Sequence, residues 1–329
     1  MFYSVIIPVF NRPDETDELL NSLCNQSYKN FEVIVVEDGS SLCCREITEK
    51  YGDRLDIHYF YKENSGPGDS RNFGAGKSKG DYLIILDSDC LVPENYFAEI
   101  EKELNENPCD AFGGPDCAHE SFSPIQKAIN YAMTSFFTTG GIRGGRKKMD
   151  KFYPRSFNMG IRRDVYEQMN GFSNMRFGED IDFSIRIFKA GHSVRLFLQA
   201  FVWHKRRTDL RKFYKQVYNS GMARINLYKR HPESLKPVHL LPTAFTLGLF
   251  FLLISSFFCI YALWLVLFYA GLIFIDASIR NKSLIVGGLS VIASFMQLLG
   301  YGFGFMHAFW QRCVLKRGEI SAFDKTFYK

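Results

Sequence analysis

Charged side chains are missing from two long stretches near the end of the 329-residue chain. No charged residue lies in positions 240–275, and between positions 283 and 311 only His307 could carry a charge. This excludes an ordinary soluble domain for this part of the chain, because such stretches are typical of membrane-spanning helices. A single helix over 240–275 would extend about 54 Å, against a hydrocarbon core of about 30 Å. The first stretch therefore predicts two short passes that turn near Ser255 and Ser256.

The second uncharged stretch leaves the number of passes open. Residues 284–310 are long enough for a third pass, and their five glycines suit close helix packing or a bend. The residues that follow, Arg312, Lys316 and Arg317, disagree with a third full crossing under the positive-inside rule. The segment 276–282 between the stretches is expected to be a loop, so both two and three passes remain possible.

Two common motifs are also missing. The eight cysteines contain no C-x-x-C pair, which excludes a zinc finger or zinc ribbon and favours reduced thiols in a protein that faces the cytosol. A phosphate-binding P-loop that ends at Gly76-Lys77-Ser78 would need glycine at position 71, where the chain has Arg71. The P-loop is therefore excluded.

A globular part and a basic segment precede the uncharged stretches. The composition, 47% hydrophobic and 23% charged, excludes wholesale disorder. Between His204 and Pro237 there are ten Lys or Arg residues and two acids. A basic stretch just before an apolar span predicts a segment that lies on anionic headgroups of the cytoplasmic leaflet. No recognisable nucleic-acid-binding module accompanies these residues, so we expect no nucleic-acid partner.

These patterns divide the chain into four parts. We expect a globular domain over 1–205, a basic juxtamembrane segment over 206–237, transmembrane helices over 238–311 and a charged tail over 312–329. Within the first part, apolar runs predict strands at 4–10, 31–36, 57–61, 82–86 and 195–202, with helices between them. Uniformly apolar strands that alternate with helices predict an α/β fold, a Rossmann-like and mostly parallel sheet with helices on both faces.

Polar residues follow three of the predicted strands. They are Phe10-Asn11-Arg12, Glu37-Asp38 and Asp87-Ser88-Asp89. Because ligands of such sheets bind beyond the carboxyl ends of the strands, one crevice is the expected site. The two carboxylates of Asp87 and Asp89 could hold Mg²⁺ or Mn²⁺ together with substrate phosphates. A turn with an Asp cap before the helix near Pro93 is the alternative, and position alone leaves both open.

A second acidic motif, Gly178-Glu179-Asp180, begins the helix expected over 179–189. Asp180 could accept a proton from an attacking hydroxyl, or it could only cap the helix. Spacing alone favours the cap. Asp182 faces another side of the helix, so only one of these two carboxylates is expected at the crevice.

Several motifs in order resemble the family 2 glycosyltransferases of GT-A fold. They are Ser4–Asn11 (SVIIPVFN), Val35–Ser40 (VVEDGS), Glu63–Asn72 (ENSGPGDSRN), Gly80–Asp89 (GDYLIILDSD), Phe157–Gly160 (FNMG), Asn170–Phe172 (NGF) and Gly178–Asp182 (GEDID). The resemblance covers residues 2 to about 205. Leu241-Pro242 and Tyr301–Phe305 also resemble the membrane tails of some bacterial members.

The resemblance implies a nucleotide-sugar donor and inverting transfer of a sugar to an acceptor hydroxyl. Asp38 matches the acid that meets the nucleotide base, with the main chain from Pro8 to Phe10 beside it, and Arg71 matches a residue that helps to hold the base. Asp87 would reach the ribose or the metal, and Asp89 would bind the metal that bridges the diphosphate. The implied cofactor is therefore a divalent cation, Mn²⁺ or Mg²⁺.

The resemblance also assigns the acceptor side of the site. Asp180 matches the general base, with Glu179 beside it near the acceptor, and Asn158 lies where the family lines the site. His204 could touch the metal or the diphosphate, or it could be a structural histidine. The metal would act as a Lewis acid on the leaving diphosphate while the base removes the hydroxyl proton.

Two departures from the family pattern refine this interpretation. Cys90 stands where the family often has a third acid, and no Q-x-x-R-W of the processive synthases follows Asp182. The resemblance therefore implies that one sugar is added, from a donor that Asp38 and Arg71 favour as a UDP-sugar. The expected acceptor is a lipid-linked glycan or polysaccharide precursor. The expected place is a bacterial inner membrane, in contact with its lipids, with the catalytic domain facing the cytoplasm.

Two other functions stay open on the sequence alone. A polyprenyl-phosphate glycosyltransferase would keep the fold and change the acceptor. A non-catalytic nucleotide-sugar-binding membrane protein would need neither Asp89 nor Asp180, and the presence of both motifs argues against it. Pure transport is disfavoured, because no acidic residue lies in the spans before Asp276 and no repeat is apparent.

Overall fold

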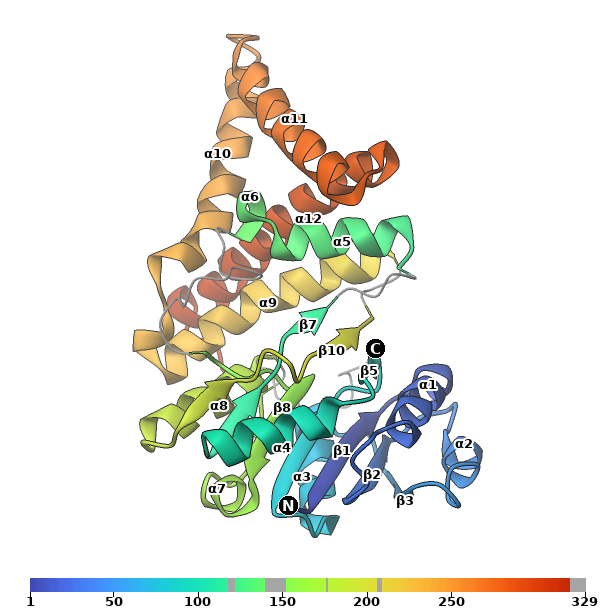
Figure 1. Cartoon of the computed structure of the whole chain (residues 1–329). Helices are drawn as coiled ribbons and strands as arrows, with labels where there is room; N and C mark the ends of the chain where they lie inside the picture. The colour runs from blue at the N-terminus through green and yellow to red at the C-terminus, as the bar shows by residue number, and fades with distance from the viewer. Residues whose placement is uncertain (118–121, 140–151, 176, 206–208, 320–329) are drawn as a thin grey trace. The chain divides into compact units, whose positions relative to one another are not determined.

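A computed structural model describes the chain except for residues 118–121, 140–151, 176, 206–208 and 320–329. The described residues form two compact units (Figure 1). The first unit contains Met1–Cys117 and Asp150–His204, and the second contains Ala118–Met149 and Lys205–Glu319. The sequence pattern placed a boundary near residue 205, and the structure adds a segment from the middle of the chain to the second unit.

The first unit is built on a seven-stranded sheet in the order β3-β2-β1-β4-β8-β6-β9. Its strands are β1 (Tyr3–Val9), β2 (Phe31–Asp38), β3 (Asp56–Lys62), β4 (Tyr82–Leu86), β6 (Ala111–Gly113), β8 (Asn158–Arg162) and β9 (Val194–Leu196). Strands β3, β2, β1 and β4 are parallel, and β8 runs antiparallel to β4 and β6. The predicted mostly parallel α/β sheet is confirmed.

A small second sheet stands beside the carboxyl end of β4. It has the order β5-β10-β7, with β5 (Cys90–Leu91), β10 (Val202–His204) and β7 (Asp116–Cys117). The single strand predicted over 195–202 is therefore wrong, because the chain forms β9 in one sheet and β10 in the other. Since β10 pairs with β5, His204 lies directly opposite Cys90.

Helices cover both faces of the large sheet. They are α1 (Pro13–Cys24), α2 (Arg45–Glu49), α3 (Pro67–Lys77), α4 (Tyr96–Glu106), α7 (Arg163–Gln168) and α8 (Glu179–Lys189). Successive strand residues point to opposite faces, so Val5 joins a core with Phe97 of α4, whereas Ile6 joins a core with Phe183 of α8. Strand β2 is buried along its whole length, which explains the apolar run 33–36 (VIVV) at its centre.

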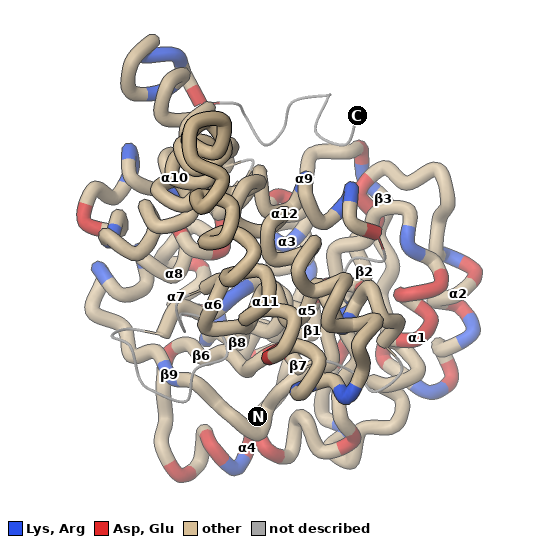
Figure 2. The backbone as a smooth tube through the Cα atoms, turned by 90° about the horizontal axis from the view of Figure 1, so that it is seen from above, with Lys and Arg blue, Asp and Glu red and all other residues tan. Residues whose placement is uncertain are grey.

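The second unit is helical. Its helices are α5 (Pro124–Thr134), α6 (Phe136–Thr139), α9 (Leu210–Arg230), α10 (Leu241–Ser255), α11 (Ala262–Asn281) and α12 (Leu284–Phe309), with short 3-10 turns at Pro232–Ser234 and Pro237–Leu240 and a π-helical turn at Trp310–Val314. Figure 2 shows that the tubes of α10 and α11 are almost free of charged residues. Glycines let α12 approach its neighbours: a Cβ at Gly304 would overlap the backbone of Tyr218 on α9.

Three of these helical segments are long and apolar enough to cross a membrane. They are Pro237–Ser255, Ala262–Asn281 and Leu284–Val314. Their number and composition indicate membrane association. The break between α10 and α11 lies at the turn predicted near Ser255 and Ser256.

The predicted loop over 276–282 is wrong, because α11 continues to Asn281. Asp276 is accommodated inside the helix by two partners. Its carboxylate accepts a hydrogen bond from Tyr131 of α5 at 2.7 Å and another from Arg280, one turn later, at 2.9 Å. An acid whose carboxylate is hydrogen-bonded in this way can lie inside a helix, so the position of the first charged residue did not mark the end of α11.

Candidate active site

The carboxyl ends of β1 and β2 are tied together by side-chain hydrogen bonds. Asn11, just after β1, has a positive φ of 52°, a conformation that asparagine tolerates better than most residues. Its side-chain oxygen accepts hydrogen bonds from the backbone N–H groups of Ser41 and Leu42 at 2.9 and 3.0 Å. Pro8 lies opposite Val36 in the sheet register. The main chain from Pro8 to Phe10 is thereby fixed beside the turn that follows β2.

Asp38, the last residue of β2, is buried and holds the loop that precedes α3. Its carboxylate accepts hydrogen bonds from the backbone N–H groups of Ser65 and Gly66, both at 2.9 Å. Lys62 donates a further charge-assisted bond at 2.8 Å. Asp38 thus fixes the loop from 62 to 66 at this edge of the sheet, and its predicted contact with a nucleotide base remains a prediction.

Arg71 of α3 joins two acidic motifs that are distant in sequence. Its two terminal nitrogens donate to Asp87 and to Glu179, each at 2.9 Å, and its guanidinium lies 5.2 Å from the ring centre of Phe172. Only 3% of Arg71 is exposed. Burial alone would lower the pKa of Arg71, but the charges of Asp87 and Glu179 raise it well above its ordinary value. The guanidinium therefore remains charged and holds the two motifs in one site.

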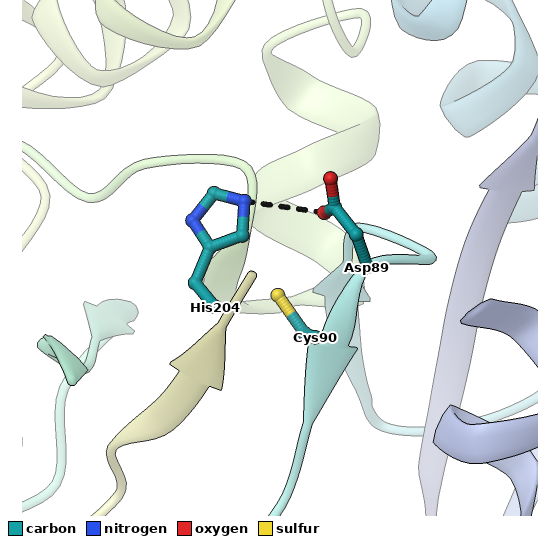
Figure 3. A group of neighbouring side chains, drawn as sticks. All are labelled: Asp89, Cys90 and His204. Atoms are coloured by element: carbon teal, nitrogen blue, oxygen red, sulfur yellow. Dashed lines mark ion pairs between the residues drawn. The ribbon is translucent and has the colours of Figure 1, made fainter. Parts of the chain in front are cut away.

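Asp89 points towards His204, with Cys90 beside them (Figure 3). Its carboxylate is 3.1 Å from Nε2 of His204 and forms an ion pair with Arg12, which follows β1. Asp89 is 7% exposed. The pairing of β5 with β10 brings Cys90 into the same group, so one potential ligand atom from each of Asp89, Cys90 and His204 lies within 4.8 Å of the others.

This group of side chains is chemically suited to a divalent cation. A carboxylate and an imidazole are common ligands of Mn²⁺ and Zn²⁺. Nδ1 of His204 is closed to solvent and has no hydrogen-bond partner among the described residues, while the ring stacks on Phe157 at 5.0 Å. Burial raises the pKa of the Cys90 thiol well above its ordinary value, and sulfur is a softer ligand than Mn²⁺ or Mg²⁺ prefers. Asp89 and His204 are therefore the better ligands in the group.

Asp180 is held by an arginine that the sequence pattern did not reveal. Arg155 donates from Nε to the Asp180 carboxylate at 2.5 Å. Burial alone would raise the pKa of Asp180, but the charge and hydrogen bond of Arg155 lower it below its ordinary value. Asp180 is therefore ionised at neutral pH. Asp182 points elsewhere and accepts hydrogen bonds from Ser173 and Arg186 at 2.7 and 2.9 Å.

The pKa of Glu179 is shifted in the opposite direction to that of Asp180. Burial and the neighbouring charge of Asp180 raise the pKa of Glu179 above its ordinary value, although Arg71 opposes this shift. Two adjacent acids thus have pKa values shifted in opposite directions, which is a pattern typical of catalytic sites.

Asn158 differs from the other predicted site residues. It is fully buried at the start of β8. Its amide donates to the Ala200 carbonyl at 2.8 Å and accepts from the Tyr96 hydroxyl at 2.6 Å. Asn158 therefore braces the loop before β10, and its predicted place in the lining of the donor site is untested.

Two arginines of the site were missed as functional residues. Arg12 pairs with Asp89 and Arg155 pairs with Asp180, so the expected metal ligand and the expected general base each have their own cation. Arg12 directly follows the β1 strand within a cluster already assigned to the crevice, and this position was a usable signal. Arg155 lies outside every recognised motif, and no sequence signal pointed to it.

Comparisons with known proteins agree with this architecture. The profile of the family described as Glycosyl transferase family 2 matches residues 4–169, which are 166 of the 329 residues. A Rickettsia bellii protein described as an uncharacterized glycosyltransferase is 43% identical over 104 residues, 32% of this chain and 15% of that protein. The glycosyltransferase AglE of Haloferax volcanii is 26% identical over 243 residues, 72% of this chain and 77% of that protein. Matches to four Rickettsia relatives cover between 15% and 30% of their lengths.

Solved structures show the same fold. The mannosyltransferase PcManGT from Pyrobaculum calidifontis, in complex with GDP-Man and Mn²⁺, aligns with a TM-score of 0.67 at 15% identity, over 94% of this chain and 87% of that one. Residues 1–349 of S. aureus TarS, in complex with UDP-GlcNAc, align with a TM-score of 0.50 at 20% identity, over 69% and 67%. The first unit thus has a GT-A-like fold, and the family profile covers its sheet from β1 to β8. The chain belongs to glycosyl transferase family 2.

Proposed function

We propose that the chain is an inverting glycosyltransferase that moves one sugar from a nucleotide-sugar donor to an acceptor hydroxyl. The acceptor we propose is a lipid-linked glycan or polysaccharide precursor. The observation that carries the proposal is the double ion pair of Arg71 with Asp87 and Glu179. It brings the motif expected to hold the donor next to the motif expected to activate the acceptor, as a transfer between two substrates requires.

On the donor side, Asp89 and His204 are the proposed ligands of a divalent cation, and Asp87 is close enough in sequence to share this role. The cation, Mn²⁺ or Mg²⁺, would supply Lewis acidity for the charge that develops on the leaving diphosphate. Arg12 forms an ion pair with Asp89 in this structure. If Asp89 bound the cation instead, the guanidinium of Arg12 would be free to pair with a phosphate of the donor. Asp38 and Arg71 are the proposed neighbours of the nucleotide base, beside the main chain of Pro8 to Phe10.

On the acceptor side, Asp180 is the proposed general base. The ion pair with Arg155 keeps Asp180 ionised, and a base must be ionised before it can accept a proton. As the acceptor oxygen forms its bond to the sugar, the bond from the sugar to the diphosphate breaks and the hydroxyl proton passes to Asp180. General base catalysis of this kind contributes about 10²–10⁴-fold to rate.

The donor class has independent support from the two structural neighbours. One was solved with GDP-Man and the other with UDP-GlcNAc, and both compounds are nucleotide sugars. We propose a UDP-sugar for this chain, and a GDP-sugar is the alternative that the test below separates.

The acceptor and the location rest on the second unit. Its three apolar helices would keep the chain in a membrane, and the last turn of α9 carries Lys229 and Arg230, which suit anionic lipid headgroups. An acceptor with a lipid anchor would be concentrated on that same surface. We propose a bacterial inner membrane with the first unit in the cytoplasm, where nucleotide sugars are made.

The test is donor turnover by the full chain in membranes. Wild type, Asp89→Ala, Asp180→Asn and a control, Asp53→Asn at an exposed position, receive a panel of UDP- and GDP-sugars with Mn²⁺ or Mg²⁺. Each is assayed with and without lipid-linked glycans and with polyprenyl phosphate. We expect one nucleotide to be released by wild type and by the control, and release to fall by at least about 100-fold in the two site variants.

Three results would contradict parts of the proposal. Equal release in all four chains would overturn the roles of Asp89 and Asp180. Transfer to polyprenyl phosphate alone would replace the acceptor with that of a polyprenyl-phosphate glycosyltransferase. Binding of a nucleotide sugar without turnover, on any acceptor, would make the chain a binding protein.

A further inference from the structure

A second group of possible metal ligands lies at the amino ends of the strands, on the edge of the sheet opposite the candidate active site. Glu32 is the second residue of β2, and Asp56 and His58 are the first and third residues of β3. Glu32 is paired with Asp56 in the parallel register, and His58 follows two positions later. Residues two apart on a strand share a face, so all three side chains are directed to the same side of the sheet.

The three side chains converge on a small volume. Nε2 of His58 lies 3.2 Å from Oδ1 of Asp56 and 3.6 Å from Oε2 of Glu32. One ligand atom from each residue lies within 4.8 Å of the others. A tetrahedral zinc ion with bonds of about 2.0–2.2 Å keeps its ligand atoms about 3.3–3.6 Å apart. Both distances to the imidazole match this spacing closely.

Glu32 is a rigid and fully buried anchor for the group. One of its carboxylate oxygens, Oε1, accepts hydrogen bonds from the Ser4 hydroxyl at 2.6 Å and from the backbone N–H of Lys79 at 2.5 Å. The other oxygen, Oε2, is closed to solvent and has no hydrogen-bond partner among the described residues. An ionised carboxylate oxygen in this situation is costly unless a cation neutralises it.

His58, like Glu32, has a buried polar atom without a hydrogen bond to any described residue. Its Nε2 atom is also closed to solvent and also lacks a hydrogen bond within the described part of the chain. A neutral imidazole that turns its Nε2 lone pair towards two carboxylate oxygens repels them. The repulsion disappears only if Nε2 carries a proton or if a cation lies between the three groups.

We propose that Glu32, Asp56 and His58 bind a zinc-type divalent cation. One imidazole and two carboxylates form a ligand set that zinc accepts, whereas Mg²⁺ prefers oxygen ligands alone. The Asp56 side chain is 61% exposed and that of His58 is 38% exposed, so solvent can supply a water as the fourth ligand. The cation would clamp β3, at the edge of the sheet order, to β2. Its role would be structural, and it is separate from the proposed transfer of a sugar.

Zinc uptake by the full chain tests the proposal. The other candidate cation group is first removed with Asp89→Ala and His204→Gln, and this background chain is dialysed against Zn²⁺. Bound zinc is counted per chain, and Co²⁺ replaces it in parallel for its visible absorption. His58→Gln should bind about one zinc ion fewer and lose the absorption of tetrahedral Co²⁺. A matched control, His192→Gln, should bind as much as the background chain.

His192 is a suitable control because it lies beside a single acid, with Nδ1 3.5 Å from Asp110. A thermal unfolding measurement gives a second readout. Zinc should raise the unfolding temperature of the background chain and should leave that of His58→Gln unchanged. His58 is half-exposed, so this variant should fold even if Glu32→Gln does not. Equal zinc uptake with and without His58, or no uptake by the background chain, would overturn the proposal.

Discussion

Removal of the Arg71 guanidinium would test how strongly the candidate site depends on its buried ion pairs. Arg71→Ala leaves Asp87 and Glu179 without their shared cation, which is 3% exposed and 2.9 Å from each carboxylate. Removing one partner of a buried ion pair costs about 3–5 kcal/mol. The Asp87 side chain is 30% exposed, so water can replace part of the lost interaction. We therefore expect a loss near the lower limit, about 3 kcal/mol.

The expected loss is large enough to measure in the full chain. The first unit contains one tryptophan, Trp203, so replacement of Trp264 and Trp310 by phenylalanine lets fluorescence report on that unit. For a domain of this size, about 3 kcal/mol lowers the unfolding temperature by about 6–12 °C. The unfolding temperatures of the chain with Arg71 and of Arg71→Ala are compared in this tryptophan-substituted background, in detergent or in lipid nanodiscs.

Arg162 provides the matched control. It also links two acids, Asp110 at 3.0 Å and Asp164, but its side chain is 44% exposed. An exposed ion pair is worth about 0–1 kcal/mol, so loss of both pairs in Arg162→Ala should lower the unfolding temperature by no more than about 8 °C, and by less than Arg71→Ala does. Equal losses in Arg71→Ala and Arg162→Ala would refute the argument from burial.

The same variant predicts a pH dependence. The pKa of Glu179 is already raised by burial and by Asp180, while Arg71 opposes the shift. Without Arg71 the folded-state pKa of Glu179 rises further above its unfolded value, so protonation favours the folded chain. The cost of Arg71→Ala should therefore be greatest at neutral pH and should shrink as the pH falls through that raised pKa. A cost that grows on mild acidification would contradict this assignment.

Four further substitutions give expected outcomes. Gly114→Ala should severely destabilise the chain in a thermal unfolding assay, because the added Cβ would overlap a neighbouring backbone carbonyl. Gly76→Ala in α3 should instead stabilise the folded chain by about 0.5–1 kcal/mol, because its added Cβ meets no atom within 4 Å. Asp38→Ala should cost about 1–3 kcal/mol for each backbone N–H left unpaired, and should abolish donor binding measured at equilibrium. Arg155→Met should raise the pKa of Asp180, so the acidic limb of the turnover profile should move to higher pH; an unshifted limb would contradict the base assignment.

Much of the first unit follows from the sequence because its central strands, β1, β2 and β4, are buried on both faces. The runs that became β1 and β4 and the centre of β2 are apolar at nearly every position, and this pattern has few explanations other than a covered parallel sheet. The polar residues after these runs then had to gather at one edge. Arg71, Asp87 and Glu179 were each assigned to the crevice, although their direct contact could not be predicted.

Contacts between distant segments were beyond the sequence pattern. Arg155 lies 25 residues before Asp180 and reaches it only because the chain folds back. The register of β2 against β3 places Glu32 opposite Asp56, and a shift of one residue would separate these side chains. No local propensity determines such pairings, so the second ligand group was missed.

The membrane helices show where composition is sufficient and where it fails. The break between α10 and α11 was predicted from length alone, because one helix over the whole run would be too long for a bilayer. The end of α11 was not predicted correctly, because hydrogen bonds from Tyr131 and Arg280 stabilise Asp276 within the helix. The contribution of α5 to the second unit rests on its packing against α12, where Ile129 and Ala293 share one core, and this pairing has no signal in the sequence.

Donor binding and proton removal are expected on the two sides of the ion pairs that Arg71 forms with Asp87 and Glu179, and binding and turnover measured side by side separate the two functions. Equilibrium binding of UDP, with and without Mn²⁺, is compared with donor turnover for the full chain and for Asp89→Ala and Asp180→Asn. We expect Mn²⁺ to strengthen UDP binding in wild type and in Asp180→Asn but to have no effect in Asp89→Ala, while turnover is lost in both variants. Mn²⁺-dependent binding that survives in Asp89→Ala, or full turnover by Asp180→Asn, would contradict this expectation.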